Sequence, residues 1–153
     1  MNIKDKILEV SALKDGTVID HIPAGSLFKV VSMLKLEKIG SMMTFGNNLE
    51  SKRLGKKGII KLADVFFKDK DINRIALVAP EAKLNIIRDY KVVEKKVVEV
   101  PDDIAGIANC VNPMCITNHE KVITKFKVID KKQVKLRCHY CEKITDIQHI
   151  KAI

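Results

Sequence analysis

Aromatic residues are scarce in this sequence. The 153 residues include five Phe, two Tyr and no Trp, and no basic run interleaved with aromatics resembles an RNA-recognition signature. The sequence also lacks a Gly-rich phosphate loop and a Ser or Cys beside an evident base, the usual marks of nucleotide-dependent and acyl-transfer enzymes. We therefore expect a chain with no catalytic activity of its own.

Long hydrophobic runs are also missing. Each apolar run ends after a few residues at a Lys, Asp or Glu, far short of the roughly 20 residues that a membrane-spanning helix needs. The first ten residues contain acidic side chains and no small-residue cleavage site after an apolar core, so a secretory signal is not expected. These absences predict a cytoplasmic protein with no membrane partner.

Positive charge is in excess, with 28 Lys and Arg against 19 Asp and Glu, a net charge of +9. An excess of this kind favours an anionic partner, either a nucleic acid or a small anion such as a nucleotide phosphate. The lysines are spread along the chain and not clustered, which weakens the nucleic-acid alternative. A zinc-ribbon nucleic-acid-binding protein stays open as the second hypothesis, and a steep loss of affinity with salt would distinguish it.

The first hundred residues alternate strand and helix patterns. In order, we expect strands at 16–22 and 41–46, a loop at 47–58, strands at 58–67 and 84–93, and helices at 25–37 and 69–78. Read along the chain, this is the split βαβ, ferredoxin-like order. The predicted fold is therefore α+β, with two helices packed on one face of an antiparallel sheet.

The pattern changes character near Pro101. Residues 100–106, VPDDIAG, form the candidate linker, because a Pro followed by two acids ends the strand pattern. Beyond it, strands are expected at 122–129 and 134–138, joined by a DKKQ turn. The sequence thus predicts two domains, residues 1–100 and a small β-rich domain at residues 101–153.

All four cysteines lie in this second domain, as CVNPMC (Cys110, Cys115) and CHYC (Cys138, Cys141). Two short-spaced pairs separated by a hairpin-sized insert are typical of two knuckles that direct four thiolates at one Zn²⁺. Disulfides or inert buried thiols are the alternatives, and the absence of a secretory signal argues against disulfides. We expect one structural zinc per chain, closed to catalytic water by its four ligands.

Histidines near the cysteines could also bind a metal. His119, His139 and His149 are more simply interpreted as surface side chains, because four thiolates already complete a tetrahedral shell.

Several segments together resemble a known family. GTVIDHIPAG, FKVVSMLKL, GKKGIIKL, APEAKLNIIRDYKVVEK and the C-x4-C and CHYCEK motifs occur in the order found in regulatory chains of aspartate carbamoyltransferase. The resemblance implies a ferredoxin-like nucleotide-binding domain followed by a zinc domain that docks on a separate catalytic chain. It also implies CTP and ATP as effectors of pyrimidine biosynthesis and a homodimer of regulatory chains.

The resemblance carries over to individual positions. The implied nucleotide-binding residues are Val10, Ala12, Leu13, Asp20, His21, Lys61, Asn85, Tyr90 and Lys95. Lys95 and His21 suit phosphates, Asp20 suits ribose hydroxyls, and the backbone of residues 10–13 suits the base.

Other positions are assigned more loosely or depart from the family. Asn112 and Glu142 resemble polar contacts to the catalytic chain. Ser11 stands where a Glu is common and Ile7 where a Lys is common, so the rank order of the CTP and ATP responses is open. Without the resemblance, the lysines of the set would be interpreted as solvated edge residues.

Overall fold

The computed structural model describes residues 12–153, and within them contacts divide the chain into two compact units. The first unit contains a five-stranded sheet and spans residues 12–27, 40–66 and 82–97. The second contains both α-helices and a four-stranded sheet and spans residues 28–39, 67–81 and 98–153. No helix of the described residues is long and apolar enough to cross a membrane.

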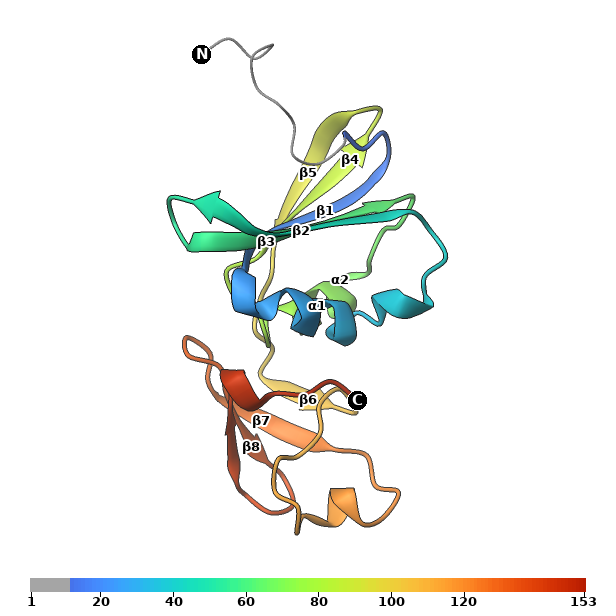
Figure 1. Ribbon diagram of the computed structural model, residues 1–153. Coiled ribbons are helices and arrows are strands. Elements are labelled where there is room, and N and C mark those ends of the chain that lie inside the picture. The colour runs from blue at the N-terminus through green and yellow to red at the C-terminus, as the bar shows by residue number, and fades with distance from the viewer. Residues whose placement is uncertain (1–11) are drawn as a thin grey trace. The chain divides into compact units, whose positions relative to one another are not determined.

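The five-stranded sheet is antiparallel throughout, in the order β2-β3-β1-β4-β5 (Figure 1). Its strands are β1 (Gly16–Pro23), β2 (Met43–Ser51), β3 (Gly55–Ala63), β4 (Lys83–Arg88) and β5 (Lys91–Val97). Strand β3 lies between β1 and β2, and β1 lies between β3 and β4, which is the split arrangement that the element order predicts. The α+β, ferredoxin-like fold class is confirmed.

Alternation along the strands separates the two faces of this sheet. Ile19 faces Ile60 on β3 and Leu84 on β4, and all three side chains are fully buried. The neighbouring positions Lys61, Asp20 and Asn85 are only partly buried. Because successive side chains of a strand point to opposite faces, one face carries apolar core residues and the other carries polar ones.

The described residues contain two α-helices, α1 (Leu27–Met33) and α2 (Asp69–Ile75). Both are shorter than the predicted helices at 25–37 and 69–78. The first is shortened because 3-10 turns occupy Ala24–Ser26 and Leu36–Lys38, and Lys35 between α1 and the second turn adopts a left-handed conformation with φ 53°.

Two of the predicted boundaries in this region are wrong. The expected loop at 47–58 is the end of a β-hairpin, in which β2 runs to Ser51 and β3 begins at Gly55. The expected single strand at 84–93 is a second hairpin that turns at Asp89 and Tyr90, whose φ angles are 51° and 64°. Two successive positive φ angles are typical of a type I′ turn, whose twist suits a tight hairpin even without glycine.

The second sheet is also antiparallel and has the order β6-β7-β8-β9. Its strands are β6 (Asp103–Ala105), β7 (Lys125–Asp130), β8 (Lys135–Cys138) and β9 (Ile144–Asp146). Strands β7 and β8 and the turn between them were predicted, but β6 and β9 were not. Strand β6 falls inside the predicted linker at 100–106. This part of the linker is a strand because its three residues pair with β7.

The small core of this sheet lies on one face. Ile104, Phe126, Val128 and Leu136 are buried there, and their neighbours along each strand are exposed or half-buried. So few large apolar side chains bury little surface, which makes the fold of this sheet dependent on a further stabilising interaction.

Gly16 at the start of β1 provides a test of the first sheet. Its φ is +144°, and a Cβ at this position would clash with the carbonyl oxygen of Leu62. We expect Gly16→Ala to lower the free energy of unfolding by about 3 kcal/mol or more, because both backbone strain and a backbone clash oppose it. Urea unfolding followed by circular dichroism measures this loss.

Gly25→Ala is the matched control, since a Cβ there would meet nothing within 4 Å. Its unfolding free energy should change by no more than about 0.5 kcal/mol. Equal urea midpoints for the two variants would contradict the geometry described for Gly16.

Candidate metal centre and sheet-face site

The four cysteine sulfurs form one cluster. Their Sγ atoms all lie within 4.8 Å of one another, with 3.6 Å between Cys110 and Cys141 and 3.7 Å between Cys115 and Cys138. Four sulfurs bound at about 2.3 Å to a central ion would be separated by about 3.8 Å, whereas a disulfide needs about 2.05 Å. All four cysteines are free thiols, so the cluster has the spacing of a metal site.

The first knuckle is the loop between β6 and β7 that carries Cys110 and Cys115. The Asn112 side-chain oxygen accepts from the Met114 backbone N–H at 3.0 Å, and the Asn112 carbonyl accepts from the Cys115 N–H at 3.0 Å. The Asn118 amide donates to the carbonyls of Asn112, at 2.7 Å, and Cys110, at 3.0 Å. These bonds fold the loop so that both thiols face the same point.

The second knuckle links the end of β8 to β9. The Glu142 N–H donates to the Cys138 carbonyl at 3.0 Å, and the Cys138 N–H donates to the Lys143 carbonyl at 3.0 Å. Glu142 adopts a φ of 64°, which reverses the chain directly after Cys141. A turn this tight brings Cys138 and Cys141 to one side of the loop.

The thiols differ in their readiness to ionise. Burial raises the pKa of the Cys110 thiol to about 12 and also raises that of Cys138. At Cys141 burial acts in the same direction, but hydrogen bonds, first from the Asn112 side chain and then from the Lys143 backbone, outweigh it and lower the pKa to about 6. A bound cation supplies the positive charge that four neighbouring thiolates require.

The histidines of this domain stay outside the cluster. His119 Nε2 lies 2.8 Å from the Pro113 carbonyl oxygen, and His149 Nδ1 lies 2.6 Å from Asp146. His139 makes an edge-on contact with the ring of Tyr140. In the described residues the metal-ligand group consists of the four cysteines alone.

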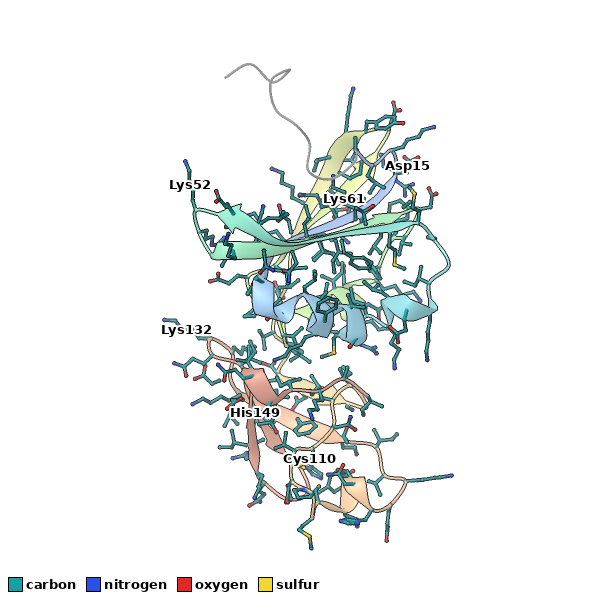
Figure 2. All side chains as sticks on the ribbon, viewed as in Figure 1. Asp15, Lys52, Lys61, Cys110, Lys132 and His149 are labelled. Carbon is teal, nitrogen blue, oxygen red and sulfur yellow. The ribbon has the colours of Figure 1, made fainter. Side chains whose placement is uncertain are left out.

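A second candidate site lies on the polar face of the five-stranded sheet. Cross-strand register aligns Lys61 of β3 with Val18 of β1, Val18 with Asn85 of β4, and Asn85 with Lys95 of β5. Residues in one such row point to the same face, so three predicted nucleotide-binding side chains come together there. Lys61 can be located on this sheet in Figure 2.

Asp20 extends the site along β1. It lies two residues after Val18, hence on the same face, and faces Lys83 on β4. Lys57 Nζ lies 2.9 Å from its carboxylate, and the Asp20 side chain is only 18% exposed. We call Lys57, Lys61, Lys83 and Lys95 the lysine face; with Asp20 as its one acid in this set, it presents a net positive surface suited to phosphate.

Lys57 was missed by the sequence analysis. Its segment was interpreted as a loop, and only the hairpin register, which pairs Lys57 with Pro23 and Leu49, brings it to Asp20. The sequence GKKGIIKL could have revealed it, because its side chains alternate between the two faces when the strand is taken to begin at Gly55.

Lys61 is partly buried on this face. Partial desolvation lowers the pKa of Lys61, while the nearby Asp20 carboxylate acts to raise it. An ammonium with reduced hydration interacts more strongly with an added anion than a fully solvated one does.

His21 lies at a β-bulge next to this face. The register between β1 and β3 shifts between Ile19 and Ile22, and His21 takes a φ of 59°. Its Nδ1 atom is buried without a hydrogen-bond partner among the described residues, because the Asp20 oxygen at 3.7 Å is too far. A buried unpaired polar atom is costly, and a ligand oxygen or amine would satisfy it.

The remaining predicted residues lie where β1 begins. Tyr90 is exposed in the β4–β5 turn, and its N–H donates to the Lys14 carbonyl at 2.9 Å, next to Ala12 and Leu13 in the chain. Val10, like Ser11 and Ile7, lies outside the described residues.

Comparisons with known proteins match the chain to one family in two parts. Residues 8–99 match the family described as aspartate carbamoyltransferase regulatory chain, allosteric domain, and residues 102–151 match the metal binding domain of the same regulatory chain.

Curated relatives match almost end to end. The aspartate carbamoyltransferase regulatory chain of Bacteroides fragilis is 59% identical over 143 residues, 94% of each chain. That of Phocaeicola vulgatus is 56% identical over 153 residues, covering 100% of this chain and 99% of the relative. The Pyrococcus abyssi regulatory chain is 56% identical over 147 residues, covering 95% of this chain and 97% of the relative.

Two family matches that together cover the chain, relatives more than half identical over nearly full length and a four-cysteine metal centre in the matched metal-binding domain lead to one conclusion. The chain belongs to the aspartate carbamoyltransferase regulatory chain family, and is a non-catalytic subunit that partners a catalytic chain in pyrimidine biosynthesis.

Proposed function

We propose that the chain binds CTP and ATP on the lysine face and passes their effect to the catalytic chain through its C-terminal domain. The observation that carries the proposal is the cross-strand row that aligns Lys61, Asn85 and Lys95. In this proposal residues 1–100 form the effector domain, residues 101–153 dock on the catalytic chain, and two regulatory chains pair as a homodimer.

The proposed site contains groups that can bind the phosphates, the ribose and the base of a nucleotide. Lysine ammonium groups form charge-assisted hydrogen bonds to phosphate oxygens, and the unpaired His21 Nδ1 adds a donor or an acceptor. The Asp20 carboxylate accepts from ribose hydroxyls, and Lys57, now paired with Asp20, can turn to phosphate. Backbone groups of residues 10–13, with Tyr90 nearby, would distinguish an amino from a keto base.

Zn²⁺ is the metal that we assign to the four-cysteine cluster. Four thiolates at tetrahedral spacing are the donor set that structural zinc sites use, and no ligand position is left for substrate. The metal stabilises the two knuckles that carry Asn112 and Glu142. Asn112 is bonded within its own loop, and Glu142 is exposed, so we assign Glu142 the more direct contact with the catalytic chain.

Zinc removal tests the metal assignment. We expect one zinc per chain, and Cys141→Ser should lose it and unfold residues 101–153, because metal binding worth about 10–16 kcal/mol drives the folding of small zinc domains. Metal analysis and hydrogen exchange measure this: amides of β7 and β8 should lose protection while those of β1 and β3 keep it.

His139→Gln is the control for this experiment and should keep its zinc, since His139 lies next to Cys138 in sequence but outside the cluster. A wild-type chain without zinc, or a Cys141→Ser chain that binds it normally, would contradict the assignment.

Substitution of Lys95 tests the nucleotide site. Because a charge-assisted contact contributes about 1.5–3 kcal/mol, Lys95→Ala should weaken CTP or ATP binding by roughly 10- to 100-fold. Calorimetric titration of the full chain at fixed ionic strength measures the change.

Lys96→Ala is the matched control from the same strand. Lys96 pairs with Leu84, so its side chain lies on the face of the sheet opposite to that of Lys95. It should bind nucleotide as the wild type does. Equal losses in both variants would indicate diffuse charge attraction, and no loss in either would exclude the lysine face.

A further inference from the structure

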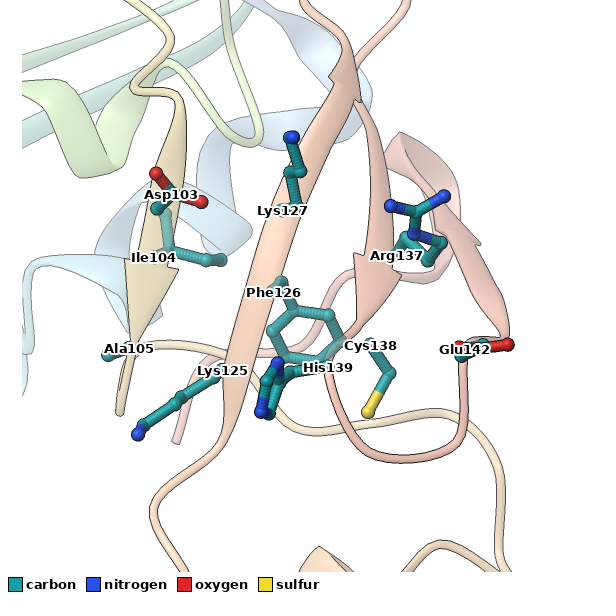
Figure 3. Close-up of a pocket in the computed structure, with 10 residues that line it drawn as sticks. All are labelled: Asp103, Ile104, Ala105, Lys125, Phe126, Lys127, Arg137, Cys138, His139 and Glu142. Atoms are coloured by element: carbon teal, nitrogen blue, oxygen red, sulfur yellow. The ribbon is translucent and has the colours of Figure 1, made fainter.

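A second basic surface lies on the exposed face of the four-stranded sheet. A cavity of about 550 Å³ is open there, and its charged and polar lining consists of Asp103, Lys125, Lys127, Arg137, His139 and Glu142. Figure 3 shows these side chains around the strands β6, β7 and β8. We call Lys125, Lys127 and Arg137 the arginine–lysine face.

Register brings two like charges together on this face. Lys127 of β7 is directly opposite Arg137 of β8, and Asp103 of β6 lies on the other side of Lys127. Like charges directly opposite each other in an antiparallel pair are destabilising. The arrangement therefore favours an added anion that contacts both side chains.

Asp103 lies opposite Lys127, but no acid of the described residues forms an ion pair with Lys127 or Arg137. Asp102 pairs with Lys131 at 2.5 Å, Asp130 accepts from the backbone of the β7–β8 turn, and Asp146 pairs with His149. Within residues 12–153 neither Lys127 nor Arg137 forms an ion pair, although Lys127 helps to lower the pKa of Asp102 at longer range. The Lys127 and Arg137 side chains can therefore both form ion pairs with a binding partner.

The surroundings suit a protein better than a polyphosphate. Asp103 and Glu142 line the same cavity and would repel a triphosphate, whereas a protein segment can offer basic groups to them. Ile144 on β9 lies directly opposite Arg137 on β8 and is 54% exposed, so apolar surface adjoins the charged side chains. Arg beside exposed apolar side chains is typical of protein–protein interfaces.

We propose that the arginine–lysine face docks an acidic segment of the catalytic chain, with one carboxylate received between Lys127 and Arg137. The inference rests on the proposed function, in which the C-terminal domain binds that chain. Planar guanidinium geometry makes Arg137 a bidentate partner for the carboxylate, and Lys125 and Lys127 supply further charge. Glu142 connects this face to the second metal knuckle, so both belong to one contact surface.

Binding of the zinc-loaded full chain to purified catalytic chain tests the proposal. The double variant Lys127→Glu/Arg137→Glu should bind about 100-fold more weakly or worse, since reversal places like charges against the acidic segment. Arg137→Lys keeps the charge but loses the bidentate geometry and should weaken binding about 3- to 10-fold. Calorimetry or surface plasmon resonance measures the affinities.

Controls separate this face from general charge and from folding. Lys132→Glu makes the same charge change as Lys127→Glu alone, at an exposed turn residue of the same domain, and should bind within about 3-fold of the wild type. Because Arg137 precedes Cys138, each variant is checked for zinc content. Lys127→Glu alone, on β7 and not adjacent to a cysteine in the sequence, should still weaken binding about 10-fold or more.

The outcomes are distinct. Wild-type affinity in the reversal variants, or an equal loss in Lys132→Glu, overturns the arginine–lysine face while the proposed function stands. A wild-type chain that does not bind the catalytic chain overturns the proposed function itself.

Discussion

The clustering of four thiols at one point is the interaction on which the C-terminal domain depends. The matched metal-binding domain, residues 102–151, buries few large apolar side chains, so hydrophobic burial within it contributes little stability. A metal ion bound by Cys110, Cys115, Cys138 and Cys141 would join the first loop to the end of β8 and so hold together strands that share little core. The positions of Lys127 and Arg137 on the exposed face of the sheet depend on these strands keeping their arrangement.

The five-stranded sheet uses alternation for a comparable purpose. Its fully buried residues Ile19, Ile60 and Leu84 share one face, and the lysines lie on the other face beside Val18. The bulge at His21 then turns one imidazole nitrogen away from any partner in the described residues. We propose that the lysines of the first sheet bind a small anion and that the basic residues of the second sheet bind a protein.

The sequence predicts chemistry here better than it predicts boundaries. Cysteine spacing alone indicated the metal centre, because knuckle geometry is local, and the βαββαβ order followed from strand and helix patterns. The sequence did not predict the roles of Lys57 and of the Lys127–Arg137 pair, because each role depends on which residues of two strands face each other. The hairpin at Asp89 and Tyr90 escaped because its turn uses left-handed residues other than Gly or Asn.

The central claim is that nucleotide bound to this chain changes the behaviour of a separate catalytic chain. The most direct test is the substrate saturation curve of the aspartate carbamoyltransferase catalytic chain, with and without this chain and with and without saturating CTP or ATP. We predict that nucleotide shifts the curve only when this chain is present, by a coupling of about 1–3 kcal/mol, and that Lys95→Ala moves the shift to higher nucleotide concentration. A curve that no nucleotide shifts in the complex, or that shifts equally without this chain, would contradict the account.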